Sequence, residues 1–148
     1  MAEDCKGEEQ QRAEGVSRYI ESADRAAQAL GIRLREARPG YALMELTVRP
    51  DMANAAGTCQ GGVIFTLADT AFACACNSHN ELTVAAGCSI EFLLPGRVGD
   101  VLRAEAAERI LVKRAGICDV TIRRQDDTVI ALFRGKSHRI GGPVVKLP

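Results

Sequence analysis

Asp69 is the most unusual side chain of the sequence, because it is the one charged residue between Asp51 and Glu81. It lies in the middle of an apolar stretch, residues 61–78, whose composition predicts a buried helix. A buried carboxylate without a partner is costly, so Asp69 must be paired, protonated or turned toward a functional cleft. No cation lies within a helical turn of it. Asp69 is therefore a candidate general base or nucleophile, with a carboxylate that caps a loop or meets an arginine as the alternative.

A polar loop that contains glycine leads into this stretch, and it reads N-A-A-G-T-C-Q-G-G from Asn54 to Gly62. The first N–H groups of a helix have no partner within the helix and attract negative charge. Glycine at the entry lets a ligand approach the backbone closely. The loop therefore predicts an oxyanion hole, in which backbone donors face a developing negative oxygen. A tight, packed turn is the alternative.

The spacing of these two features constrains how they could act together. Gly61 and Asp69 are separated by eight positions, which corresponds to about 12 Å along one helix. This is too far for both to act on one carbonyl carbon. If they cooperate, Asp69 must face the helix start of another subunit. A two-fold dimer would then contain two equivalent sites, each built from both chains.

The rest of the chain predicts the elements that position these residues. Residues 1–15 are expected to be a polar, mobile leader, and residues 16–30 an amphipathic surface helix that Gly31 ends. Residues 32–50 predict two strands joined by a turn at 38–40. Four further segments have the composition of strands: 83–94, 98–112, 116–125 and 128–139.

The connections between the last four segments are short, at 95–97, 114–116 and 126–127, which favours antiparallel neighbours. A long antiparallel sheet and one apolar helix of matching length predict an α+β fold, with a curved sheet wrapped around the helix at 61–78. Residues 16–148 are expected to form this single domain.

Composition excludes several classes of function. The 148 residues include 19 basic and 19 acidic side chains, and this zero net charge argues against a partner nucleic acid or anionic membrane. The uncharged runs around Asp69 are too short to span a membrane. The six cysteines include no C-x-x-C pair, so we expect free, mostly buried thiols in a cytoplasmic protein, and no metal site.

The pattern N-x-x-G-x-x-Q-G-G-x-x-x-x-L-A-D, from Asn54 to Asp69, resembles the hotdog-fold acyl-CoA thioesterases. The segments E-F-L-L-P-G at 91–96 and F-R-G-K-S-H-R at 133–139 are similar to the branch of that family that acts in bacterial phenylacetic acid degradation. The resemblance covers residues 17–142. It implies a hotdog fold and hydrolysis of aryl-acyl-CoA thioesters such as phenylacetyl-CoA or ring-hydroxylated phenylacetyl-CoA.

The resemblance also implies roles for single residues. Asp69 matches the catalytic acid, either as general base on water or as nucleophile on the thioester, and the Gly61 N–H matches the oxyanion donor. Asn54 and Gln60 match the positions that orient the carbonyl or the water. No cofactor is implied, since CoA is part of the substrate. The family forms homodimers that pair into homotetramers.

Two departures from the family leave open what positions the attacking water. Many relatives carry histidine at the position of Gln60, and many carry serine or threonine near Ala85, where this chain offers no hydroxyl.

Binding of the CoA phosphates needs cations at the mouth of the cleft, although a solvated surface charge is the alternative for each candidate. The candidates are Arg97, Lys113, Arg114, Lys136, His138 and Arg139. The motif positions Gly62, Pro95, Gly96 and Ser137 are further candidates for substrate contacts. Phe72 and Phe92 are candidates for the acyl pocket, with a role in the core as the alternative.

Three other readings of the sequence remain. Cys59 lies beside the predicted oxyanion loop and could be a nucleophile if a histidine lowered its pKa. A hotdog hydratase or dehydratase would need a histidine beside the acid, but His79 and His138 lie outside the central motif. A non-catalytic acyl-CoA-binding module would not need a buried carboxylate.

Overall fold

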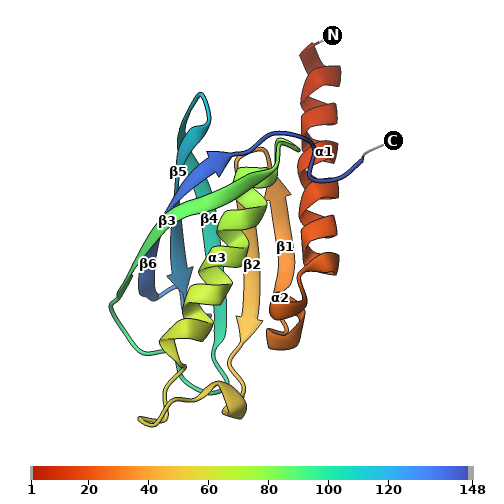
Figure 1. Cartoon of the computed structure of the whole chain (residues 1–148). Coiled ribbons are helices and arrows are strands. Elements are labelled where there is room, and N and C mark those ends of the chain that lie inside the picture. Colours follow the sequence, from red (N-terminus) through yellow and green to blue (C-terminus); the bar gives the residue numbers. More distant parts are fainter. Residues whose placement is uncertain (1, 147–148) are drawn as a thin grey trace.

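The computed structural model describes residues 2–146 and shows one antiparallel sheet with a helix against one of its faces (Figure 1). The sheet has six strands in the order β1-β2-β4-β5-β6-β3. These strands are β1 (Arg33–Arg38), β2 (Tyr41–Thr47), β3 (Thr83–Phe92), β4 (Val101–Val112), β5 (Ala115–Arg123) and β6 (Val129–Arg139). The central helix is α3 (Gly61–Asn77). The predicted α+β fold with one central helix is confirmed.

Packing between α3 and the sheet depends on small side chains at the points of closest approach. Ala68, Ala71 and Ala75 of α3 are fully buried, as are Ala104 and Ala106 of β4. In β6, Gly135 faces the ring of Phe72, and a Cβ at this glycine would lie 2.6 Å from the ring. The helix therefore lies close to the sheet, and the apolar helix composition follows from this burial.

The connection at 95–97 does not join neighbouring strands, so this part of the predicted topology is wrong. β3 pairs with β6 and lies at the edge of the sheet, whereas β4 pairs with β2 and β5. The reason is that the connection pairs with the loop before α3. The Gly96 carbonyl accepts a hydrogen bond from the Cys59 N–H at 2.8 Å, and the backbone of Arg97 forms an isolated antiparallel β-bridge with Thr58.

The expected mobile leader at 1–15 is helical instead over its described residues, 2–15. Residues 1, 147 and 148 lie outside the described residues. Helix α1 (Ala2–Ala23) is followed at once by α2 (Arg25–Leu30). The break falls at Asp24, whose extended backbone and carboxylate cap α2 through the Ala27 N–H. The polar N-terminal segment continues as part of helix α1 because the inner face of this helix remains apolar as far as Ala13, which is fully buried.

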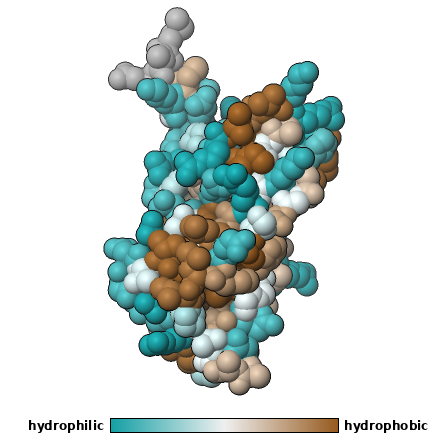
Figure 2. Space-filling view, turned by 90° about the vertical axis from the view of Figure 1, so that its left-hand side faces the viewer, coloured by the Kyte–Doolittle hydropathy of each residue, from teal (hydrophilic) through white to brown (hydrophobic). Residues whose placement is uncertain are grey.

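The two edges of the sheet differ. Helix α1 lies along β1, where the Glu21 carboxylate accepts the Leu34 N–H at 2.8 Å and the Gln10 amide donates to the Ala37 carbonyl at 2.8 Å. Nothing covers the outer side of β3 in the described chain, and most of its residues are exposed. Figure 2 views the molecule from this side and shows a gathered apolar patch. An uncovered apolar edge favours pairing with another strand.

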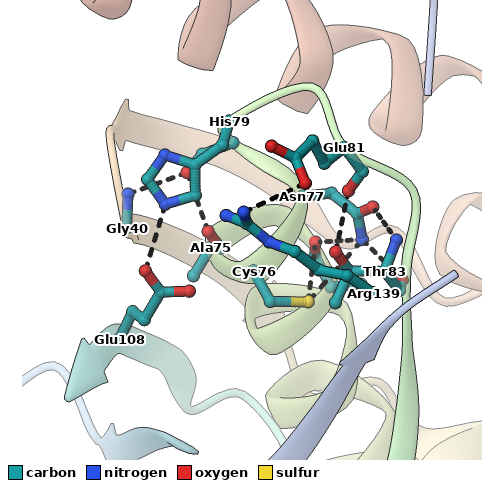
Figure 3. A network of polar contacts seen from close by, with 11 residues as sticks. Gly40, Ala75, Cys76, Asn77, His79, Glu81, Thr83, Glu108 and Arg139 are labelled. Carbon is teal, nitrogen blue, oxygen red and sulfur yellow. Dashed lines mark hydrogen bonds and ion pairs between the residues drawn. The ribbon is translucent and has the colours of Figure 1, made fainter. Parts of the chain in front are cut away.

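The C-terminal end of α3 is tied to three strands by the polar network of Figure 3. The Asn77 amide donates to the Thr83 carbonyl at 3.0 Å and accepts the Thr83 N–H at 2.9 Å. His79 lies 3.0 Å from Glu108 of β4. These contacts fix the helix relative to the sheet, so its opposite end holds a defined position.

No helix in the described part of the chain is long and apolar enough to cross a membrane. The six cysteines are free thiols. Four of them are buried, as expected, whereas Cys5 and Cys88 are exposed.

Candidate functional site

The start of α3 keeps a single unpaired backbone donor. The N-cap residue Gln60 accepts the Gly62 N–H with its side-chain oxygen at 2.5 Å. Its carbonyl accepts the Val63 and Ile64 N–H groups at 2.9 and 3.4 Å. Among residues 2–146, no acceptor faces the Gly61 N–H. The positive end of the helix dipole is thus directed through one free N–H group, as an oxyanion site requires.

Asn54 builds the loop that precedes this donor. Its side-chain oxygen accepts the Ala56 and Thr58 N–H groups at 3.0 and 3.1 Å, and its amide donates to the Thr58 hydroxyl at 3.1 Å. Gly57 closes the turn with a φ of +78°, a conformation that favours glycine. The polar groups of Asn54 are therefore engaged within the loop, and its predicted contact with the carbonyl or the water stays a prediction.

Asp69 is partly buried on α3 and takes part in none of the ion pairs formed by the described residues. Burial raises the pKa of its carboxyl above the ordinary value, and the negative charge of Asp24 raises it further. A neighbouring cation or a capping contact would lower this pKa instead. The alternative in which Asp69 is a paired structural carboxylate therefore has no support within the described chain.

Helix α3 is not buried all round, because one stripe of its surface remains open. The stripe is formed by residues three or four positions apart that are exposed or partly buried: Gly62, Phe65, Thr66, Asp69 and Ala73. It borders the free strand β3, where burial raises the pKa of the Cys88 thiol and the negative charge of Asp69 raises it further. Asp69 thus lies on an open face of the helix beside the uncovered edge of the sheet.

Two hollows meet at Gly61. One has a volume of about 380 Å³ and lies toward residues 93–95. The other has a volume of about 440 Å³ and lies toward Gly62, Phe65 and Ile90. Gly61 and Phe92 line both hollows, as does Asn54. The free N–H group therefore lies at the junction of two cavities that a substrate could fill.

Three predicted substrate contacts are buried in the protomer. Phe72 is 1% exposed and packs against Gly135, and Ser137 is 2% exposed beside Gly116. Gly96 is buried against Cys59 and supports the loop. Core packing, which was the alternative for Phe72, is what the structure shows. Ser137 alternates with the outward-facing Lys136 and His138 along β6, and it therefore points into the core.

The candidate cations separate into two groups. Arg97 lies next to Thr58, at the Gly61 end of the protomer. The other candidates lie at or near the end of the sheet that is opposite to Gly61. On β6, Ala131 pairs with Phe92 near Gly61, whereas His138 pairs with Val84, about 23 Å further along the strand. Lys136 is two residues from His138, and the turn between β4 and β5 carries Lys113 and Arg114. Arg139 is already paired with Glu81 at 3.0 Å.

Several residues that line the hollows were not candidates from the sequence, among them Phe65, Ile90, Leu93 and Leu94. The sequence pattern could have identified two of them. Phe65 lies four positions before Asp69, which places both on one face of a helix. Ile90 alternates with Phe92 along a strand, which places both on one side of the sheet. Leu93 and Leu94 belong to the E-F-L-L-P-G motif, but no local pattern predicts their exposure, which depends on how the chain turns after β3.

Cys59 is a poor nucleophile in this fold. Burial raises the pKa of its thiol to about 11, and the charge of Asp100 contributes to the rise. The thiol is therefore almost fully protonated at neutral pH. His79 pairs with Glu108 at the far end of α3, and His138 also lies at that end. Within the described residues, no three histidine, cysteine or acidic side chains come together as a metal site.

Comparison with known proteins places these features in a family. The sequence profile of the thioesterase superfamily matches residues 56–131. The chain is 48% identical, over 82% of its length and 86% of the relative, to the acyl-coenzyme A thioesterase PaaI of Escherichia coli K12. It is 36% identical to an esterase of Archaeoglobus fulgidus that carries only a provisional assignment, over 88% of the chain and 84% of the relative.

The structural comparison agrees. The structure of the E. coli PaaI protein, from the phenylacetic acid degradation operon, superimposes with a TM-score of 0.89 at 44% identity. The match covers 90% of this chain and 97% of that one. The hotdog fold that the sequence motifs implied is therefore confirmed.

Proposed function

The chain belongs to the thioesterase superfamily, and we propose that it hydrolyses aryl-acyl-CoA thioesters, phenylacetyl-CoA or ring-hydroxylated phenylacetyl-CoA, to the free acid and CoA. The observation that carries this proposal is the single free N–H of Gly61 at the start of α3, at the junction of two hollows. A thioester needs one such donor for its carbonyl oxygen. Its acyl group and its CoA part leave the carbonyl carbon in different directions and therefore need two spaces.

The reaction follows from these groups. The thioester oxygen accepts the Gly61 N–H, and the helix dipole stabilises the negative charge that develops on this oxygen. The ionised Asp69 carboxylate takes a proton from water as the water oxygen bonds to the carbonyl carbon. The C–S bond then breaks, and the CoA sulfur receives the proton from Asp69. In the nucleophilic variant of this route, the Asp69 carboxylate attacks the carbonyl carbon and the C–S bond breaks, which releases the CoA thiolate and leaves an anhydride. Water then cleaves the anhydride to the free acid and the Asp69 carboxylate, and the proton that this water gives up goes to the thiolate. Neither route requires a cofactor.

A homodimer is part of the proposal. Gly61 and Asp69 of one chain are about 12 Å apart along α3, so one chain alone does not place both at one carbonyl carbon. The open stripe of α3 and the uncovered edge of β3 lie together, and both are available to a second copy. Two-fold pairing along this edge would bring Asp69 of one chain toward the partner subunit's Gly61. Further pairing of dimers into tetramers is what the family resemblance implies.

The same pairing gives a role to the distant cations. If the two β3 strands run antiparallel, the Val84 end of one lies beside the Phe92 end of the other. Lys136, His138 and the turn that carries Lys113 and Arg114 would then approach the partner's hollows, while Arg97 serves its own chain. The phosphates of CoA would thus be held by both subunits. The cytoplasmic location expected from the sequence stays a prediction.

Release of free thiol from phenylacetyl-CoA, ring-hydroxylated phenylacetyl-CoA and a medium-chain acyl-CoA tests the proposal. Wild type should hydrolyse the aryl thioesters, and Asp69→Asn should lower kcat by at least about a hundredfold. Asp126→Asn makes the same chemical change in an exposed turn and serves as the matched control. If wild type binds CoA but hydrolyses none of the three, the enzymatic proposal is wrong and a non-catalytic acyl-CoA-binding module remains.

A further inference from the structure

The ring of Phe92 stands against Gly61. A Cβ on this glycine would lie 3.1 Å from the tip of the ring, which comes from the last residue of β3. The ring therefore lies beside the residue that carries the free N–H group. Phe92 lines both the hollow toward residues 93–95 and the hollow toward Phe65 and Ile90.

A thioester bound at this donor must extend in two directions. Its oxygen is held at the Gly61 N–H, and the acyl group and the pantetheine arm leave the carbonyl carbon on opposite sides. The acyl group of the proposed substrates is an uncharged aryl group. The pantetheine arm carries amides and leads to phosphates. The two arms therefore need spaces of different chemistry.

We propose that Phe92 separates these arms, so that the acyl group lies between Phe65 and Ile90, and the pantetheine arm leaves past Thr58 and Leu94. This inference rests on the proposed function, because it assigns the two parts of an acyl-CoA to the two hollows. It makes Ile90 and Phe65 determinants of acyl specificity.

The hollow toward residues 93–95 fits the CoA arm because it leads to a cation. Thr58 lines this hollow, and its backbone forms an isolated β-bridge with Arg97. The Arg97 side chain is exposed, and it takes part in none of the ion pairs of the described residues. The neighbouring Asp100 carboxylate is engaged by the Arg97 backbone N–H and by the Gln125 amide. A phosphate that leaves this hollow therefore meets an available guanidinium.

No charged residue of the described chain lines either hollow, and the hollow toward α3 fits an aryl group because two aromatic rings, Phe65 and Phe92, line it together with Ile90. Phe65 is held edge-on to Phe133 with ring centroids 5.3 Å apart, so its position is fixed by the core. Ile90 pairs with Phe133 across β3 and β6 and packs against the same core. An aryl ring between Phe65 and Phe92 would find aromatic surfaces on two sides. Ile90 forms the floor and limits the size of the acyl group.

The test compares matched variants in the two hollows. Ile90→Phe narrows one hollow and Ile90→Ala widens it, while Leu94→Phe and Leu94→Ala do the same in the other. For each variant, kcat/KM is measured with acetyl-CoA and phenylacetyl-CoA, together with inhibition by free CoA. Circular dichroism identifies any variant that fails to fold. The comparison at that position then relies on the other of its two substitutions.

Ile90→Phe should lower the ratio of phenylacetyl-CoA to acetyl-CoA activity at least about tenfold, and Ile90→Ala should raise it. The Leu94 variants should change kcat/KM for both substrates by a common factor and alter inhibition by free CoA. A ratio that responds to Leu94 and not to Ile90, or to neither, would overturn the assignment. Absence of turnover by wild type would instead contradict the proposed function, so the two failures can be told apart.

Discussion

The side-chain oxygen of Gln60 accepts the backbone N–H of Gly62 at 2.5 Å, and this contact leaves Gly61 as the free donor of the first turn of α3. Gln60 thus shapes the site by occupying the neighbouring donor, and its predicted contact with the carbonyl or the water stays a prediction. The glutamine side chain supplies the acceptor oxygen that this contact with Gly62 needs. The contact also leads to a first prediction, in which stability and activity respond differently to two substitutions of one residue.

Gln60→Ala removes the cap and should lower the free energy of unfolding by about 1 kcal/mol. Gln60→Glu keeps an acceptor oxygen for the Gly62 N–H and should retain most of the stability. It should still lower kcat, because its negative charge lies beside the developing oxyanion. Urea unfolding and thiol release measure the two effects. Equal stability of the alanine and glutamate variants would contradict the capping role.

Gly61→Pro tests the free N–H itself. Proline at the first position of a helix is well tolerated, and the residue before it, Gln60, already has the extended backbone that proline requires, with φ −60° and ψ 131°. The substitution therefore deletes the donor with little change to the helix. We expect kcat to fall by about 10²–10³.

Gly61→Ala is the control for that experiment, since it keeps the N–H group and adds a Cβ that meets the Phe92 ring at 3.1 Å. It should retain clearly more activity than the proline variant. If both variants lose the same activity, the crowding of Phe92 and not the missing donor is responsible.

The pH dependence of kcat/KM should reflect Asp69. The reaction needs the ionised carboxylate, and burial together with the charge of Asp24 raises the pKa of Asp69 above 3.8. Activity should therefore be lost, as pH falls, at a pH above that value. Asp24→Asn removes one cause of the rise and should shift the midpoint of this acid limb to lower pH, while asparagine still caps α2. An acid limb that does not move, or that moves upward, would contradict the charge coupling.

Shared sites in a dimer can be tested by mixing two inactive variants. Asp69→Asn and Gly61→Pro are each expected to be inactive as homodimers. When the two are co-expressed with different tags, half of the dimers are mixed, and each mixed dimer has one intact site. The pool should regain about a quarter of the wild-type activity. Purified mixed dimers that remain inactive would show that both residues act within one chain, or that the two chains do not share a site.

The close approach of β6 to α3 predicts a large effect at Gly135. A Cβ there would lie 2.6 Å from the ring of Phe72, so Gly135→Ala should destabilise the fold by about 1–3 kcal/mol. Phe72→Leu in the same chain should recover part of this loss, because it removes the ring atoms that clash. A double-mutant cycle by urea unfolding measures the coupling. Strictly additive effects would show that the two positions do not restrict each other.

The sequence was most informative about features with a short-range cause. The lone charge of Asp69, the glycines before it and the apolar composition of 61–78 together predict the helix and its chemical groups, because helix starts and packing faces depend on neighbours within a few residues. Strand segments could be predicted for the same reason. The separation of Gly61 from Asp69 also follows from helix geometry alone.

The tertiary structure decided which of these elements meet. The pairing of β3 with β6, the burial of Phe72 and Ser137, and the contact of Phe92 with Gly61 each depend on residues far apart in the chain. Local patterns cannot specify them, since a strand of a given composition can pair with several others. Whether residues 95–97 close a hairpin or pair with the loop at 58–59 is a competition between long-range hydrogen bonds. That competition placed β3 at the open edge, beside the face of α3 that carries Asp69.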